Sequence, residues 1–234
     1  MPKVVAAIPC FNEQQFIGDV VSKARNHVDL VIVIDDGSSD DTAKVAQAAG
    51  AEVIRHEARQ GAGAATKSGF EAAKKNNADV LVTLDGDGQH DPNDIPRLLN
   101  PILDGEADLV IGSRFLIPSS PDIRFKTNAP RYRKFGINII TWLYNLGSST
   151  KVSDSQSCFR AHSQRIIDAI NITEDGFGFS VQVLIQARRK GFAIKEVPIS
   201  CLYHPQGSSL NPVSHGLGVA LTVIKLRLKS LVSA

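Results

Sequence analysis

Two carboxylates separated by one residue, Asp85 and Asp87, are the side chains best suited to chemistry in this sequence. They lie in the segment VLVTLDGDGQHDP, directly after an apolar run, where both could reach one hard cation. Mg²⁺ and Mn²⁺ prefer oxygen ligands and commonly bridge to substrate phosphates, and Gln89 offers a further oxygen. Asp and Gly also form turns, but placement at the end of a buried strand favours a metal site made by Asp85, Asp87 and Gln89.

A second apolar run ends in two carboxylates in the segment VIVIDDGSSDDT, and the second of them is Asp36. Asp36 could accept a hydrogen bond from a ribose hydroxyl or a base N–H, whereas a helix cap accounts only for Ser39 and Asp40. Gly61 and Gly63 precede another helical segment, which permits close approach of a nucleotide but equally fits simple helix entry. The first turn, PCFNEQ, contains no glycine, which argues against an NAD-binding fingerprint.

Arg114 follows a further buried strand in the segment VIGSRF and is the first of several basic residues before position 135. A guanidinium binds two phosphate oxygens in a fixed fork. Because Arg114 stands at the carboxyl end of a strand, we predict that it contacts phosphate.

These residues need a sheet to bring them together, and five apolar runs of strand length recur at 4–8, 30–34, 51–54, 80–84 and 109–111. The runs lack period-two alternation, as strands buried on both faces do. Helical segments alternate with them at 14–24, 41–49, 64–75 and 94–103, with Asp91 or Asn93 as the cap of the last. This order predicts an α/β fold with a doubly wound, mainly parallel sheet that binds ligands at the carboxyl ends of its strands. A helix near 137–146 and a strand near 194–202 complete the same domain.

The composition excludes several classes of protein. The chain has 234 residues, of which 43% are hydrophobic, and its 26 basic and 24 acidic side chains leave a net charge of +2. Neither a disordered chain nor a nucleic-acid-binding protein fits these values. Three cysteines without metal-type spacing indicate a reducing compartment, and no apolar window is long enough to span a bilayer. Since no signal peptide is evident, the predicted location is cytoplasmic.

Six segments occur in one order along the chain: IPCFNE, VIDDGSSDDT, DGDGQHDP, IGSRF, DSQSCFRA and EVPI. In these the sequence resembles the family 2 glycosyltransferases of the GT-A (Rossmann-like) fold. Within that family it is similar to the polyprenyl-phosphate glycosyltransferases, the group that contains the dolichyl-phosphate mannose and glucose synthases. On this resemblance residues 1–213 form the GT-A domain, with a nucleotide-sugar half at 1–114 and an acceptor half at 115–213. An amphipathic helix at 214–234 follows the domain.

The resemblance assigns roles residue by residue, and it implies that Asp85, Asp87 and Arg114 take part in catalysis and that Asp85, Asp87 and Gln89 hold the metal. The expected nucleotide-binding residues are Pro9, Phe11, Asn12, Glu13, Asp36 and Gly61. The expected contacts to acceptor and other phosphates are Arg114, Arg131, Arg133 and Arg160. Cys158 stands where the D-x-x-S-G-F-R element of the family usually has glycine. Tyr203 and His204 stand near a position where the mannose synthases tend to carry arginine, and SSLNPVSHG looks more like relatives that use UDP-sugars.

The implied activity is a metal-dependent, inverting transfer of a hexose from a nucleotide sugar to a polyprenyl or dolichyl phosphate, with a UDP-sugar favoured and Mg²⁺ or Mn²⁺ as cofactor. Three alternatives stay open: a GDP-mannose-dependent dolichyl-phosphate mannose synthase, a family 2 transferase that extends a saccharide, and a non-catalytic subunit that binds nucleotide sugars. An aspartate-nucleophile phosphatase is disfavoured, because its paired aspartates normally follow the first strand and here they follow the fourth.

The last segment of the chain has an apolar stripe at helical spacing. Its members are Leu217, Leu221, Ile224, Leu228 and Leu231, flanked by Lys225, Arg227 and Lys229. Such a helix could dock on an anionic membrane surface, which would make the protein peripheral to the cytoplasmic membrane face, or it could bind a membrane subunit. Packing against the core or a second copy is the alternative, and Val219 and Leu226 on the opposite side favour it.

Overall fold

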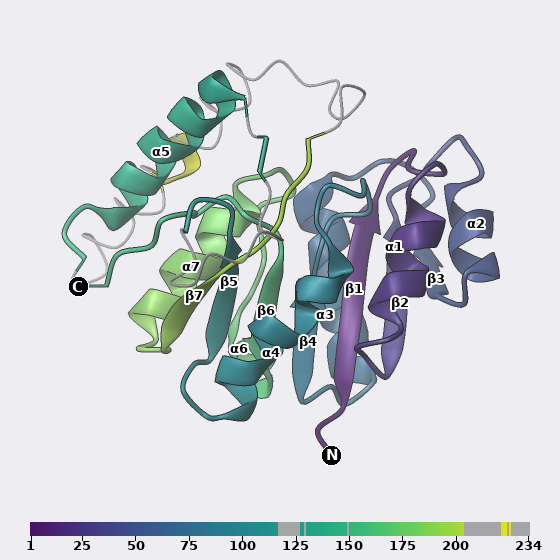
Figure 1. Cartoon of the computed structure of the whole chain (residues 1–234), viewed down its shortest axis with the longest axis horizontal. Coiled ribbons are helices and arrows are strands. Elements are labelled where there is room, and N and C mark those ends of the chain that lie inside the picture. The colour runs from purple at the N-terminus through teal and green to yellow at the C-terminus, as the bar shows by residue number, and fades with distance from the viewer. Residues whose placement is uncertain (117–126, 129, 149, 204–220, 224, 226–234) are drawn as a thin grey trace.

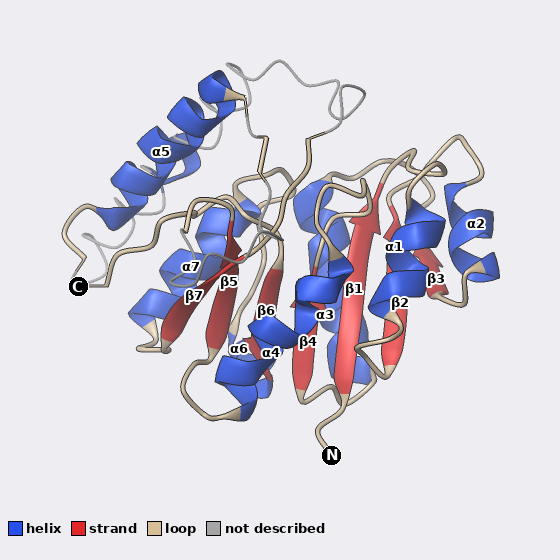
Figure 2. Cartoon of the chain, viewed as in Figure 1, coloured by secondary structure: helices blue, strands red, loops and turns tan. Residues whose placement is uncertain are grey.

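The computed structural model describes residues 1–116, 127–128, 130–148, 150–203, 221–223 and 225. A seven-stranded sheet of order β3-β2-β1-β4-β6-β5-β7 runs through this part, and helices cover both of its faces (Figures 1 and 2). The strands are β1 (Val4–Cys10), β2 (Leu30–Asp35), β3 (Glu52–Arg55), β4 (Val80–Thr83), β5 (Leu109–Ser113), β6 (Arg160–Ser163) and β7 (Ile194–Pro198). The helices are α1 (Ile17–Ala24), α2 (Thr42–Ala48), α3 (Ala62–Lys75), α4 (Ile95–Leu103) after a 3₁₀ turn (Pro92–Asp94), α5 (Arg131–Asn145), α6 (Gln164–Ala169) and α7 (Phe179–Arg189). The predicted α/β fold is confirmed.

The central strand β1 shows why the strands read as continuous apolar runs. Val5 and Ala7 belong to the hydrophobic cluster that includes residues of α3, α5, α6 and α7, whereas Ala6 and Ile8 belong to the cluster that includes residues of α1, α2 and α4. All four are fully buried. Since neighbouring side chains of a strand point to opposite faces, a strand covered by helices on both sides must be apolar at every position.

The sheet places a crevice at the end of β1. β2 pairs in parallel with one side of β1, and β4 pairs in parallel with the other side. In doubly wound sheets the loops at such a branch point leave in opposite directions and open a crevice at the carboxyl ends of the strands. The segments that carry Glu13 and Asp85 begin there.

Strand β6 is an element that the apolar pattern did not predict. It lies antiparallel between β4 and β5 and separates two strands that are otherwise consecutive in the chain. Its sequence RAHS contains one apolar residue, so no hydrophobic run marks it. Arg160 and His162 are nonetheless 2% exposed, because the neighbouring strands and helices enclose them.

The ends of several helices differ from the prediction. α1 begins at Ile17 rather than at residue 14, and α5 begins at Arg131 rather than near residue 137. The Asp91 carboxylate accepts from the Asn93 N–H at 3.1 Å, which confirms Asp91 as the cap of the 3₁₀ turn before α4. Ser39 is not the cap of α2, because the helix begins at Thr42 after Asp41; the Asp40 carboxylate accepts from the Thr42 N–H at 3.0 Å.

The predicted helix at 214–234 lies outside the described residues except at 221–223 and 225, which are helical. Val223 is fully buried, Leu221 is 58% exposed, and Lys225 Nζ lies 3.6 Å from Glu174 Oε1. These contacts attach this short piece to the body of the protein. Among the described residues, no helix has the length and apolar character needed to cross a membrane.

Candidate active site

Three acidic side chains share the crevice at the ends of β1 and β4. Burial and the negative charges of Asp87 and Asp85 raise the pKa of Glu13 to about 7. Burial and the charge of Asp87 likewise raise the pKa of Asp85 to about 7, against the lowering effect of the Arg114 cation. Carboxyl groups behave in this way when they are buried and held close to like charges. The site therefore carries an excess of negative charge that a cation would neutralise.

The donor chemistry fits a hard divalent cation that shares its ligands with a substrate. In the described part of the chain, no group of three or more His, Cys, Asp or Glu side chains is arranged to enclose a metal. Mg²⁺ is commonly held by one or two carboxylates plus substrate phosphates and water, and Asp85 and Asp87 supply such a pair. Gln89 is buried, and its N–H donates to Asp87 Oδ1 at 3.0 Å. Gln89 thus orients Asp87, while its role as a metal ligand stays a prediction.

His90 lies beside the acidic pair without joining it. Its Nδ1 is 3.8 Å from Asp85 Oδ2, and its ring packs against Phe159 with centroids 5.4 Å apart. Burial and the Arg114 cation lower the pKa of His90 to about 3, so the imidazole is neutral at physiological pH. The ring is a packing partner of the site.

The predicted nucleotide-binding carboxylate, Asp36, is held by the protein itself. Its Oδ1 is hydrogen-bonded to His56 Nδ1 at 2.8 Å and to the Gln60 N–H at 2.9 Å. Its Oδ2 accepts from the Gly61 N–H at 2.8 Å. Since these bonds fix the turn that leads into α3, Asp36 shapes the crevice next to the end of β2, and a contact with nucleotide stays a prediction.

Gly61 has a structural reason to be glycine. Its φ is +110°, and a Cβ atom there would lie 2.5 Å from the Asp175 carbonyl oxygen. The same carbonyl accepts from the Gly63 N–H at 2.7 Å, so it caps the start of α3. The N-terminus of α3 is therefore occupied by protein. The geometry favours the interpretation in which Gly61 and Gly63 are needed for the chain to enter the helix.

The loop after β1 is locked to the loop after β2. The Asn12 N–H donates to Ser38 Oγ at 2.9 Å, and the Glu13 N–H donates to Thr42 Oγ1 at 2.8 Å. Asn12 has a φ of +58°, a left-handed conformation that asparagine tolerates better than most residues. These bonds hold Glu13 toward the acidic pair.

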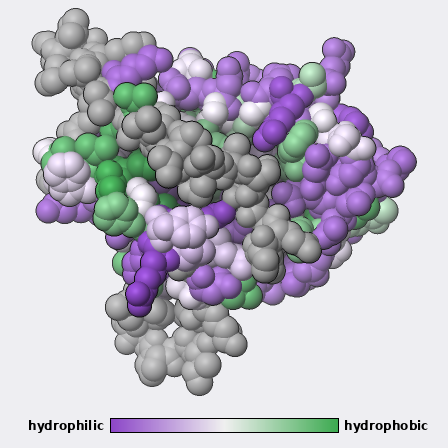
Figure 3. Space-filling model, turned by 90° about the horizontal axis from the view of Figure 1, so that it is seen from above, coloured by the Kyte–Doolittle hydropathy of each residue, from purple (hydrophilic) through white to green (hydrophobic). Residues whose placement is uncertain are grey.

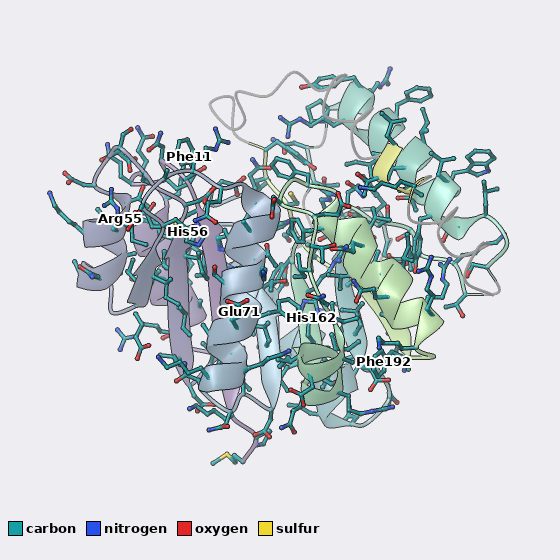
Figure 4. The ribbon with its side chains drawn as sticks, turned by 180° about the vertical axis from the view of Figure 1, so that it is seen from behind. Phe11, Arg55, His56, Glu71, His162 and Phe192 are labelled. Carbon is teal, nitrogen blue, oxygen red and sulfur yellow. The ribbon has the colours of Figure 1, made fainter. Side chains whose placement is uncertain are left out.

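Phe11, a predicted nucleotide-binding residue, is in contact with Arg59. The Arg59 guanidinium carbon lies 4.1 Å from the centroid of the Phe11 ring. Figure 4 shows Phe11, Arg55 and His56 at one end of the sheet. Arg59 was not predicted, and no sequence pattern distinguishes it from other exposed arginines. Pro9 is deeper, where it lines a small cavity with Thr83, Asp85 and Cys158.

Cys158 fits its backbone without glycine. Among the described residues, the non-glycine residues with a positive φ are Asn12 and Asn77 alone, so position 158 does not demand a glycine conformation. Burial and the nearby charge of Asp85 raise the pKa of the Cys158 thiol far above its ordinary value. The side chain is thus an inert part of the cavity wall.

Arg114 lies on the other side of the crevice, where three of the five N–H groups of its guanidinium are hydrogen-bonded. Its Nε and Nη2 donate to the two oxygens of Asp154 at 2.7 and 2.8 Å, and its Nη1 donates to the Tyr203 hydroxyl at 2.9 Å. Burial alone would raise the pKa of Asp154, but the Arg114 cation and its hydrogen bonds hold that pKa below the usual value. Glu196 accepts from the N–H groups of Ser153 and Asp154, which fixes the loop that presents Asp154.

Of the three other predicted phosphate ligands, Arg133 shares a contact with Arg114, and Arg131 and Arg160 do not. The Arg133 guanidinium carbon lies 5.2 Å from the Tyr203 ring centroid, so Arg133 and Arg114 meet on the same tyrosine. Arg131 is exposed at the start of α5. Arg160 is buried in β6, where its guanidinium donates to the carbonyls of Ser180 and Ser155. The geometry therefore favours a structural role for Arg160, and its contact with phosphate stays a prediction.

This chain is similar to known proteins along most of its length. Residues 5–167 match the family model described as glycosyl transferase family 2. A UDP-N-acetylglucosamine–dolichyl-phosphate N-acetylglucosaminyltransferase of Methanococcus voltae is 33% identical over 84% of this chain and 84% of that protein. An undecaprenyl-phosphate mannosyltransferase of Micrococcus luteus is 33% identical over 88% of this chain and 86% of its own length.

A similar solved structure is glucosyl-3-phosphoglycerate synthase from Mycobacterium tuberculosis, in complex with Mn²⁺, UDP and glucosyl-3-phosphoglycerate. It superimposes with a TM-score of 0.75 over 96% of this chain and 79% of that chain, at 24% identity. At this level of identity the likeness is one of fold.

Proposed function

This chain belongs to glycosyl transferase family 2, and from that premise we propose that it transfers a hexose from a UDP-sugar to a polyprenyl or dolichyl phosphate with inversion. The observation that carries the proposal is the opposition of charge across one crevice. Glu13, Asp85 and Asp87 form its negative side, and on its other side Arg133 meets Arg114, which is paired with Asp154. A metal-bound diphosphate suits the first side, and a phosphate acceptor suits the second.

In the proposed reaction an oxygen of the acceptor phosphate forms a bond to the anomeric carbon of the sugar. The bond from that carbon to the diphosphate oxygen breaks, and the nucleoside diphosphate leaves with the electron pair. A phosphate monoester is already an anion at neutral pH, so the acceptor needs no general base. The protein's contribution is to position the two reactants and to stabilise charge.

Within this proposal each group has a separate task. A divalent cation held by Asp85 and Asp87 would neutralise the charge that develops on the leaving diphosphate. Arg114 is kept in place by Asp154 and Tyr203, and with Arg133 it would hold the acceptor phosphate. Phe11 and Arg59 offer a ring and a planar cation against which a base can stack.

Two observations support a UDP-sugar as donor. Tyr203 stands near a position where mannose synthases tend to carry arginine. The relative from Methanococcus voltae is named for a UDP-sugar. GDP-mannose is the second candidate, because other relatives are named as mannosyltransferases. Calorimetric titration in Mn²⁺ should show UDP binding more tightly than GDP, and the reverse order would transfer the proposal to GDP-mannose.

The decisive assay pairs a panel of UDP- and GDP-sugars with polyprenyl phosphates in detergent and follows the lipid product by mass spectrometry. The expected result is a metal-dependent hexosyl-phosphoryl lipid from one UDP-sugar. Absence of product with every lipid phosphate, together with transfer to a saccharide, would assign the chain to the transferases that extend glycans.

A further inference from the structure

His56 is a buried histidine that the proposed reaction does not use. Its side chain is 9% exposed, and its Nδ1 lies 2.8 Å from Asp36 Oδ1. Its other ring nitrogen, Nε2, lies 3.0 Å from Ser68 Oγ on α3, so two elements fix the ring. Figure 4 shows His56 at the same end of the sheet as Phe11. The ring is thus held against a predicted nucleotide-binding carboxylate.

Within the described part of the chain, the hydrogen bonds of Asp36 leave one acceptor position open. A carboxylate has about four such positions, two on each oxygen. Oδ1 accepts from His56 Nδ1 and from the Gln60 N–H, and Oδ2 accepts from the Gly61 N–H. Because both oxygens already accept backbone N–H groups, the histidine nitrogen is the donor of its bond. The open position is therefore on Oδ2.

Asp36 lies beside the two side chains against which a base can stack. Its N–H donates to the Cys10 carbonyl at 2.9 Å, and Cys10 directly precedes Phe11. Its Oδ1 accepts from the N–H of Gln60, which directly follows Arg59. Figure 3 looks onto this end of the sheet, where hydrophilic residues cover the half of the molecule that contains β1, β2 and α2. A base that stacks on Phe11 or Arg59 can present its polar edge to Asp36.

The number of open acceptor positions discriminates between bases. The Watson–Crick edge of uracil has a single N–H group, N3–H, between two carbonyl oxygens. The same edge of guanine has two adjacent donors, N1–H and the N2 amino group, which together match the two oxygens of a carboxylate. With His56 and Gln60 on Oδ1, Asp36 satisfies the one donor of uracil but only one of the two donors of guanine. A buried donor without a partner weakens binding.

We propose that His56 is a positioning residue that selects a uracil base, because it occupies one oxygen of Asp36 and leaves the other to accept the N3–H group. The inference rests on the proposed UDP-sugar donor and deepens it, since it names the residue through which Asp36 distinguishes UDP from GDP. In Mn²⁺ the wild-type protein should bind UDP about tenfold or more tightly than GDP.

A modified nucleotide tests the contact on the wild-type protein. Calorimetric titration in Mn²⁺ compares UDP with 3-methyl-UDP, which lacks the N3–H group. The methylated nucleotide should bind about tenfold or more weakly, because the open position of Asp36 then has no donor. Equal affinity for the two nucleotides would overturn the inference. If 2′-deoxy-UDP were weakened in that case, Asp36 would be assigned to the ribose instead.

Substitutions separate the hydrogen bond of His56 from its packing. His56→Ala frees a position on Asp36 Oδ1, so the ratio of the dissociation constants of GDP and UDP should fall about tenfold. His56→Asn should restore most of the wild-type ratio, because its amide nitrogen is as many bonds from the backbone as Nδ1. His27→Ala, at a half-buried histidine before β2, is the matched control and should leave both dissociation constants unchanged. Circular dichroism and thermal melting check that each variant is folded.

The outcomes distinguish this inference from the proposed function. A merely structural role of His56 would weaken both nucleotides alike, so an unchanged ratio in folded His56→Ala overturns the inference, while transfer from a UDP-sugar to a lipid phosphate still supports the proposed function. If the ratio depends on His56 but no lipid phosphate is ever glycosylated, the inference stands and the proposed acceptor is wrong. Tighter binding of GDP than of UDP by the wild-type protein would overturn both the UDP donor and its selection by His56.

Discussion

The two sides of the crevice handle their charges in opposite ways. On the nucleotide side, Glu13 and Asp85 are held among like charges, and the pKa of each is raised to about 7. On the other side, Arg114 is paired with Asp154, and the pKa of Asp154 is held below its usual value. The first side concentrates like charges, whereas the second pairs opposite charges.

The largest effect is expected on the side that concentrates like charges. Asp87→Ala should reduce transfer by about a thousandfold, because it removes a carboxylate that would hold the metal against the leaving diphosphate. The thermal midpoint should stay level or rise, since a source of repulsion is lost. Asp104→Ala, at an exposed carboxylate at the end of α4, is the control. Near-normal metal-dependent transfer by Asp87→Ala would refute the site.

A comparable change on the side that pairs opposite charges should reduce stability instead. Asp154→Asn leaves the Arg114 guanidinium buried without its counter-ion, and breaking a buried pair costs about 3–5 kcal/mol. Urea unfolding measures the loss. Asp19→Asn, which breaks the exposed pair with Lys23, is the matched control and should cost under about 1 kcal/mol. Equal losses of stability in the two variants would show that the Arg114–Asp154 pair contributes no more to the fold than an exposed pair does.

The pH dependence should separate the two sides further. Below about pH 7 the Glu13 and Asp85 carboxyl groups bind protons that compete with a metal, so affinity for Mn²⁺ with UDP should rise from pH 6 to pH 8.

Stability without metal should depend on the pKa of Glu13, which is 4.5 in the unfolded chain and about 7 in the folded protein. The stabilising contribution of Glu13 is therefore fully present below pH 4.5 and is lost as the pH rises through 7. Thermal melts without metal should show Glu13→Gln gaining on the wild type across this range. Parallel curves would contradict the raised pKa.

The smallest effect is expected from Tyr203→Phe. The change removes one hydrogen bond to Arg114 and leaves the Asp154 pair intact, which should raise KM for the acceptor about fivefold with little change in kcat. Steady-state kinetics at saturating donor measure it. If KM for the donor changes instead, Tyr203 belongs to the nucleotide side.

The prediction from sequence succeeded for the strands, whose pattern is local. The apolar runs identified β1 to β5, and predicted acidic residues follow the ends of β1, β2 and β4, while the roles of these residues stay predictions. It was incomplete for Asp36, whose carboxylate is hydrogen-bonded to His56 from a different strand end. His56 belongs to no recognisable sequence motif, so its pairing with Asp36 is visible only in the folded structure.

The sequence by itself determined that this is a mainly parallel α/β protein with acidic strand ends. Strands that are buried on both faces of a sheet need apolar residues at every position, and the resulting apolar runs are visible in the sequence. The tertiary structure decided which partner each polar group took. Strand β6 enters between β4 and β5 with a polar sequence, and Asp154 meets Arg114 from 40 positions away. Such pairings depend on how distant segments of the chain pack, so local patterns of hydrophobicity do not predict them.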